Sequence, residues 1–262
     1  MADLKISGAS KIKLGVWFLD RDADLSFQVS ANETQQNQTI IIDWGDGSPP
    51  QEHAFTNSNQ VRFERNYEDY LADNDYEVYV TIHGNITSLD CEQQGLVDII
   101  FSDCETLQTV ACGKQSWGSK HGELHALDFS RCPSLETLEC EGSLVSKIKL
   151  NGCSKLKYLN LNDNELSELD LSGCPSLEQL FLSENPLEAL DLSAQKRLYN
   201  VNLSDTELDD DELDQTIETL NDGKLFDEHG EELRKTINVT DTPYYDDLDK
   251  SNGEAKGWEF EE

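Results

Sequence analysis

The sequence predicts a mainly β protein with an N-terminal β-sandwich, a solenoid with strands on both sides, and an α/β C-terminal cap. Three observations predict this fold. An apolar phrase recurs every 21 residues, short alternating patterns precede it, and a helical pattern follows it. A sustained repeat of this length is typical of a solenoid, because one coil buries its apolar face only against neighbouring coils. We divide the chain into residues 1–84, 85–207 and 208–262.

The first segment, residues 1–84, is predicted to form short strands. Apolar and polar residues alternate in LSFQVSA and YEVYVTI, as in half-buried strands, and runs of Gly, Pro, Asn and Asp separate such stretches. The sequence GDGSPP after Asp43 and Trp44 indicates a turn. Several strands at this spacing favour a small antiparallel β-sandwich.

Three features of this segment resemble the PKD-type immunoglobulin-like domain. They are the strand end and turn at 43–47 (DWGDG), Tyr67, and the late strand at 76–80 (YEVYV). The resemblance implies a β-sandwich that acts as a spacer or adhesive module of an extracellular protein.

The central segment, residues 85–207, repeats the phrase LxxLxL, in which the fourth and sixth residues point inward. Seven consecutive fourth positions are separated alternately by 10 and 11 residues. These positions are Leu138, Ile148, Leu159, Leu169, Leu180, Leu190 and Val201. Since the phrase occurs twice per 21 residues, strands are expected along two sides of the coil.

Polar and small residues recur three positions after the sixth residue of the phrase. Asn164 and Asn185 follow one ladder, and an inward amide at a bend satisfies main-chain groups whose burial would otherwise cost about 1–3 kcal/mol each. All seven cysteines fall on inward positions. Their odd number and ladder spacing predict buried, reduced thiols rather than disulfides.

The doubled phrase resembles the short nested leucine-rich repeats called IRREKO repeats. The final segment, with its helical pattern, TINV strand and terminal KGW, is similar to the tails of leucine-rich repeat proteins of Bacteroidetes. The resemblance implies a binding scaffold that is exported or exposed at a cell surface.

The final segment, residues 208–262, is predicted to cap the solenoid, since the last coil needs a cover for its apolar rung. Leu213, Ile217 and Leu220 have helical spacing. Asp209 and Glu212 resemble a helix N-terminal capping pair, and Gly223 indicates a helix stop.

Composition excludes some partners. The formal charge of -33 repels phosphate backbones, so we expect no nucleic acid partner, and it suits solubility, a cationic partner or calcium. No apolar run approaches the roughly 20 residues that span a bilayer. The start MADLKISG lacks the pattern of a signal peptide. We therefore expect either a cytoplasmic protein or one whose leader is absent, and the family resemblance favours the extracellular side.

Candidate chemical sites are few. His121 and His125 lie four residues apart, but within a loop, so exposed polarity is the favoured interpretation. Asp128, Asp170 and Asp191 share one repeat position, but Lys149 interrupts the row and favours a mixed-charge face over a calcium site. With no nucleophile or phosphate-loop pattern, the sequence predicts no catalytic, cofactor-binding or metal-binding residue.

Aromatic residues at outward positions are the candidate partner site. Tyr158, Phe181 and Tyr199 lie in three consecutive coils, and Trp117 lies in an inserted loop. Outward aromatic residues on adjacent strands form interface anchors, unless another part of the protein covers them.

The sequence therefore predicts a non-enzymatic scaffold that binds another protein through a strand-lined face. One alternative is a carbohydrate- or cell-wall-binding adhesin that uses the same rings. Another is an accessory module of a calcium-dependent enzyme, and a third is a structural spacer.

Overall fold

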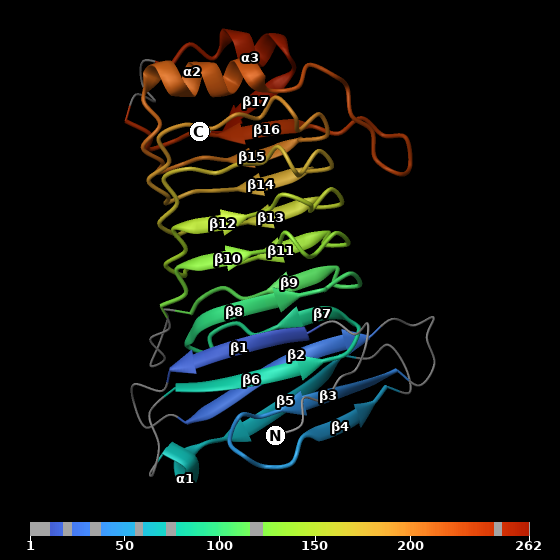
Figure 1. The fold of residues 1–262 in the computed structure, drawn as a ribbon. Helices are drawn as coiled ribbons and strands as arrows, with labels where there is room; N and C mark the ends of the chain where they lie inside the picture. The colour runs from blue at the N-terminus through green and yellow to red at the C-terminus, as the bar shows by residue number, and fades with distance from the viewer. Residues whose placement is uncertain are drawn as a thin grey trace.

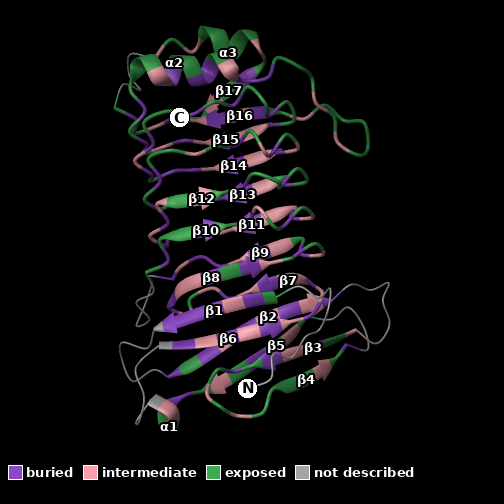
Figure 2. Cartoon of the chain, in the orientation of Figure 1, coloured by how far each residue is buried: buried purple, intermediate pink, exposed green. Residues whose placement is uncertain are grey.

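The structure is a computed structural model of the chain, and it describes residues 11–17, 23–31, 38–55, 60–71, 77–115, 123–243 and 248–261. It is a mainly β protein in which an N-terminal pair of sheets continues into a stack of coils, with two helices at the far end (Figure 1). Purple, buried segments run through the interior along the length of the chain (Figure 2).

The N-terminal region contains six strands and a short helix. They are β1 (Lys11–Trp17), β2 (Asp24–Ala31), β3 (Thr39–Asp43), β4 (Gln51–Ala54), β5 (Val61–Asn66), α1 (Glu68–Leu71) and β6 (Glu77–His83). One five-stranded sheet has the order β4-β3-β6-β1-β8, in which β8 comprises Leu96–Ser102, and β5 and β2 end a second sheet.

Residues of the two sheets bury one another. Leu25, Phe27 and Val29 alternate along β2 as buried residues, and the ring of Phe27 lies 5.7 Å from that of Trp44, which follows β3 in the other sheet. The Tyr67 hydroxyl donates to the Trp44 carbonyl at 2.7 Å. Trp44 and Tyr67, two of the residues behind the PKD resemblance, are thus in contact, whereas Tyr76 lies outside the described residues. Membership of the PKD family stays a prediction.

Both N-terminal sheets continue directly into the first coil. Strand β7 (Ile86–Asp90) pairs antiparallel with β2 and parallel with β9, while β8 (Leu96–Ser102) pairs antiparallel with β1. Strand pairing therefore crosses residue 85, the predicted boundary of the solenoid.

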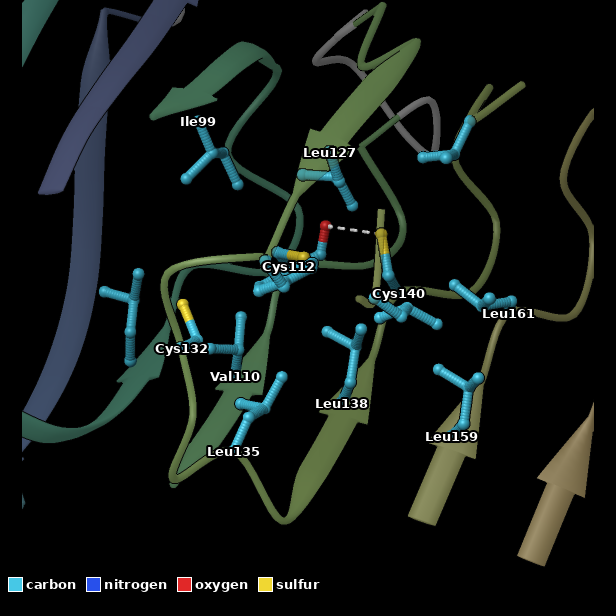
Figure 3. Packing of buried hydrophobic residues seen from close by; sticks show 14 of the residues in the cluster. Ile99, Val110, Cys112, Leu127, Cys132, Leu135, Leu138, Cys140, Leu159 and Leu161 are labelled. Atoms are coloured by element: carbon cyan, nitrogen blue, oxygen red, sulfur yellow. Dashed lines mark hydrogen bonds between the residues drawn. The ribbon is translucent and has the colours of Figure 1, made fainter. Parts of the chain in front are cut away.

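One side of the solenoid is formed by eight parallel strands. We call these strands, together with the side chains that point outward from them, the first face. After β7 these strands are β9 (Thr109–Ala111), β11 (Thr137–Glu139), β13 (Tyr158–Asn160), β14 (Gln179–Phe181), β15 (Asn200–Asn202), β16 (Lys235–Asn238) and β17 (Trp258–Glu261). Leu159 is in register with Leu138 and Leu180, and Leu180 with Val201. All four are at most 1% exposed, which confirms the predicted apolar column. Figure 3 shows Val110, Leu138 and Leu159 pointing into the same interior.

The second face, on the opposite side of the coils, forms fewer strands than predicted. Strands β10 (Ala126–Asp128) and β12 (Lys147–Lys149) pair in parallel. The equivalent residues 168–170 and 189–191 form no strand, although Leu190 is buried and Leu169 is half-buried against the core. The prediction of strands on this side therefore holds only for the first coils.

The C-terminal residues lie against the last coil. Helix α2 (Asp210–Thr219) begins after Asp209, whose carboxylate accepts the Glu212 N–H at 3.0 Å, as predicted. The helix ends before Leu220 rather than at Gly223, because the chain becomes extended at Leu220. Thr216 donates to the Leu190 carbonyl at 2.9 Å, which joins the helix to the coil. A second helix, α3 (Ser251–Ala255), lies beside α2 (Figure 1).

Candidate interaction face of the solenoid

Tyr158 and Phe181 form an aromatic contact on the first face. Tyr158 opens β13, and Phe181 closes β14, so the two residues are diagonal neighbours: Tyr158 is in register with Gln179, and Phe181 with Asn160. Their ring centroids are 5.4 Å apart. Side chains alternate between the two sides of a strand, so both rings lie on the opposite side from the buried leucines. We call Tyr158 and Phe181 the aromatic pair.

The other two predicted aromatic residues differ from this pair. Tyr199 lies one residue ahead of β15, where its N–H donates to the Glu178 carbonyl at 3.0 Å. Burial raises the pKa of Tyr199, and Glu178 raises it further. Trp117 lies outside the described residues. The structure thus brings two of the four predicted residues into ring contact.

The aromatic pair is half-buried rather than fully exposed. Tyr158, Phe181 and Tyr199 are all of intermediate exposure. Within the described ranges, the large apolar side chains classed as exposed are instead Ile100 and Phe226, at 43% and 57%. The neighbouring coils therefore hold the two rings in place and leave part of each accessible.

Four carboxylates lie on the same face, between the aromatic pair and the N-terminal end of the solenoid. We call Asp90, Glu92, Glu139 and Glu141 the acidic row. Lys114 lies among them, with its ammonium 2.9 Å from Glu141 and 3.9 Å from Glu92. Glu141 also accepts a hydrogen bond from the Asn160 amide at 2.8 Å, which links the row to the strand of Tyr158.

The second face carries a hollow of about 1000 Å³ that sequence reasoning missed. Ile148 and Leu169 line it together with Ile100, and charged side chains such as Lys149 and Asp170 surround it. The small outward residues Ala126 and Ala189 are the sequence signal that would have indicated it, because larger residues at these positions would fill the space.

The aspartates of the second face have local partners. Lys149 bonds Asp128 at 2.9 Å, which agrees with the predicted mixed-charge face. Asp170 accepts the N–H of Ser172, and Asp191 that of Ser193, at 2.9 and 2.8 Å. These hydrogen bonds lower the pKa of both carboxyls and stabilise the turn that follows each phrase.

All seven cysteines are free and buried, as predicted. Burial raises the pKa of Cys153 to about 11 and, with help from Cys153 and Asp170, that of Cys174 to about 12. The Cys140 thiol lies 3.8 Å from the Cys112 carbonyl (Figure 3). Because the thiolate is the nucleophile, these side chains act as core residues rather than as reactive groups.

The described residues include no group of three or more His, Cys, Asp or Glu side chains placed to hold a metal ion. Of the two candidate histidines, His121 lies outside the described residues. His125 is exposed, and its Nδ1 atom lies 3.1 Å from the Leu144 carbonyl. In the part of the chain that the structure describes, no helix is long and apolar enough to cross a membrane.

Comparison with known proteins identifies the repeat. The profile of the leucine rich repeat family matches residues 143–187. No curated protein matches the chain. Among solved structures, the functional domain of InlJ from Listeria monocytogenes, described as including a cysteine ladder, is similar with 22% identity and a TM-score of 0.49. That match covers 64% of this chain and 33% of the InlJ chain, so it spans about a third of that structure. The repeat profile, with the stacked leucine columns, supports a leucine-rich repeat protein.

Proposed function

We propose that this protein is a non-enzymatic interaction scaffold that binds a protein partner through the first face of its solenoid. Export or display at a cell surface is part of the proposal, by resemblance of the repeats and tail to surface leucine-rich repeat proteins. Protein binding is the general role of such solenoids, and no described residue suggests a reaction.

The contact between Tyr158 and Phe181 carries the proposal. Each ring stands on a strand that pairs on both sides, so the backbone beneath them is rigid before any partner arrives. A rigid anchor loses little conformational freedom on binding, and Tyr and Phe rings supply large apolar contact area. The half-exposed pair therefore has the properties of an interface anchor.

The test uses substitutions that copy the neighbouring coils. Tyr158 is in register with Thr137 of the neighbouring strand, and Phe181 is in register with Asn160 and Asn202. The double variant Tyr158→Thr with Phe181→Asn therefore places at each position a residue that a neighbouring strand carries there. A display library of random peptides is selected on the immobilised full chain. Peptides selected on the wild-type chain should bind the double variant more weakly than the wild type.

The matched control carries Lys147→Thr and Glu168→Asn, on the second face. Peptides that bind both variants as tightly as the wild type would contradict the proposal, and peptides lost only with the control would move the site to the second face.

The adhesin alternative rests on the same two rings, because aromatic faces also stack on sugars. A glycan array separates the two functions. Glycans retained by the wild type and lost with Tyr158→Thr and Phe181→Asn would favour a carbohydrate-binding protein.

A further inference from the structure

We propose that the aromatic pair and the acidic row form one docking surface, and that its partner is a basic protein segment in which Lys or Arg residues accompany an apolar side chain. This inference rests on the proposed function and names its partner class.

The two parts of the surface follow one another across the sheet. The last residues of the strands β7, β9, β11, β13 and β14 are in register and form one row across the sheet. In this order they are Asp90, Ala111, Glu139, Asn160 and Phe181. Adjacent strands lie about 4.8 Å apart, so Glu139 is about 10 Å from the backbone of Phe181. An extended segment that crosses strands β7 to β14 meets carboxylates first and rings next (Figure 1).

Charge on this part of the face is unbalanced. The acidic row contains four carboxylates, and the Lys114 ammonium approaches two of them, Glu92 and Glu141. Burial raises the pKa of Glu92, Lys114 opposes that shift, and Asp90, Glu139 and Glu141 raise it further. The carboxylates therefore repel one another, and an arriving cation would relieve that repulsion.

The rings lie within the field of these carboxylates. Burial raises the pKa of Tyr158, and Glu139 and Glu141 raise it further. A guanidinium placed over either ring would be attracted both by the negative face of the ring and by the Glu139 carboxylate. Arginine combines both contacts in one side chain, which makes it the preferred anchor of the partner.

Charge also disfavours other occupants. A second copy of this chain carries the same formal charge of -33, and nucleic acid is a polyanion. A basic protein segment is the occupant that suits both the carboxylates and the rings.

The experiment that tests this inference measures the amino-acid composition of peptides selected for binding. Random peptides of about 12 residues are long enough to cross five strands. They are selected on the wild-type full chain and counter-selected on the Tyr158→Thr and Phe181→Asn variant. We expect the remaining peptides to be enriched in Arg or Lys and in apolar residues. Their Kd should rise about tenfold with the aromatic variant, and several-fold with Glu92→Gln and Glu139→Gln.

A matched charge control is needed because the whole protein is acidic. Glu228→Gln with Glu231→Gln removes the same charge from exposed residues of a distant loop, and should leave the Kd unchanged. Binding should also weaken from about 50 to about 500 mM salt, since exposed charges are screened.

Three outcomes would overturn the inference. Neutral or acidic peptides that depend on the aromatic pair would refute the basic partner and leave the proposed function intact. Equal weakening by the loop control and by Glu92→Gln with Glu139→Gln would reduce the effect to overall charge. Absence of any peptide that depends on the aromatic pair would refute both proposals.

Discussion

The side-chain amide of Asn185 donates to the main-chain carbonyl of Leu161, in the preceding coil, at 2.8 Å. The same amide nitrogen reaches the carbonyls of Leu182 and Ser183 at 3.0 and 3.2 Å, and its oxygen accepts the Leu166 N–H at 3.1 Å. One side chain thus joins two coils at the bend that follows the first-face strand.

The Asn185 bonds predict a large loss of stability in Asn185→Ala. The change removes the Asn185 partners of the buried Leu166 N–H and of the Leu182 carbonyl, whereas the Leu161 and Ser183 carbonyls keep other donors. We expect the free energy of unfolding to fall by about 2–3 kcal/mol. Urea denaturation measures it. Asn200→Ala, on the first face, is the control and should cost about 0.5 kcal/mol or less. Equal losses in the two variants would show that the inward amide has no special role.

The leucine column predicts a cavity effect. Leu180 is fully buried between Leu159 and Val201, so Leu180→Ala should cost about 3 kcal/mol, because rigid coils on both sides limit collapse of the cavity. Gln179→Ala, one residue away and outward, should cost about 0.5 kcal/mol or less. A loss below about 1 kcal/mol in Leu180→Ala would contradict the column.

The buried thiols predict alkaline sensitivity. The folded-state pKa values of Cys153 and Cys174, about 11 and about 12, lie above the usual value of about 8.5 for an exposed thiol. Below pH 8.5 the thiols are protonated in both states, and their contribution to stability is fully present. As pH rises toward 11 and 12, the unfolded state loses these protons first, so stability falls.

Measurement of unfolding free energy from about pH 8 to about pH 11 tests this dependence. Cys153→Ala removes one titrating group and should make the decline shallower. A decline of the same slope in wild type and variant would assign the pH effect to other groups.

Burial also predicts slow thiol modification. In the native protein, a thiol reagent at pH 8 should react slowly, and in denaturant it should titrate all seven cysteines. Rapid reaction of any cysteine in the native state would place that thiol at the surface.

The aromatic double variant should remain folded. Tyr158→Thr with Phe181→Asn removes a half-buried ring contact, worth about 0.5–1.5 kcal/mol, and inserts residues that neighbouring strands carry at the same positions. Urea denaturation and circular dichroism should show a small loss of stability and unchanged β content. Unfolding of the variant would mean that the rings serve the sheet, and binding would then be tested with each single substitution.

Sequence reasoning predicted the interior of the solenoid well, because the repeat leaves little choice. Once apolar residues recur every 21 positions, Leu159 must stack on Leu138, and the Asn and Cys positions follow at the bends. Gln115 was missed: it takes the same place as Asn164 and Asn185 in an earlier coil, with its amide donating to the carbonyls of Cys91 and Cys112 at 2.9 Å. The sequence signal was a glutamine, whose side chain carries the same amide group on a longer chain, at the repeat position that asparagine takes in later coils.

Sequence by itself determined the coil, its inward columns and its buried thiols, since each depends on residues a fixed number of positions apart. Only the tertiary structure decided that Tyr158 contacts Phe181 while Tyr199 lies just ahead of its strand, and that only the first coils form strands on the second face. It also decided that β7 and β8 join the N-terminal sheets to the first coil. These features depend on the register between strands and on how closely neighbouring coils pack, which no spacing along one chain specifies.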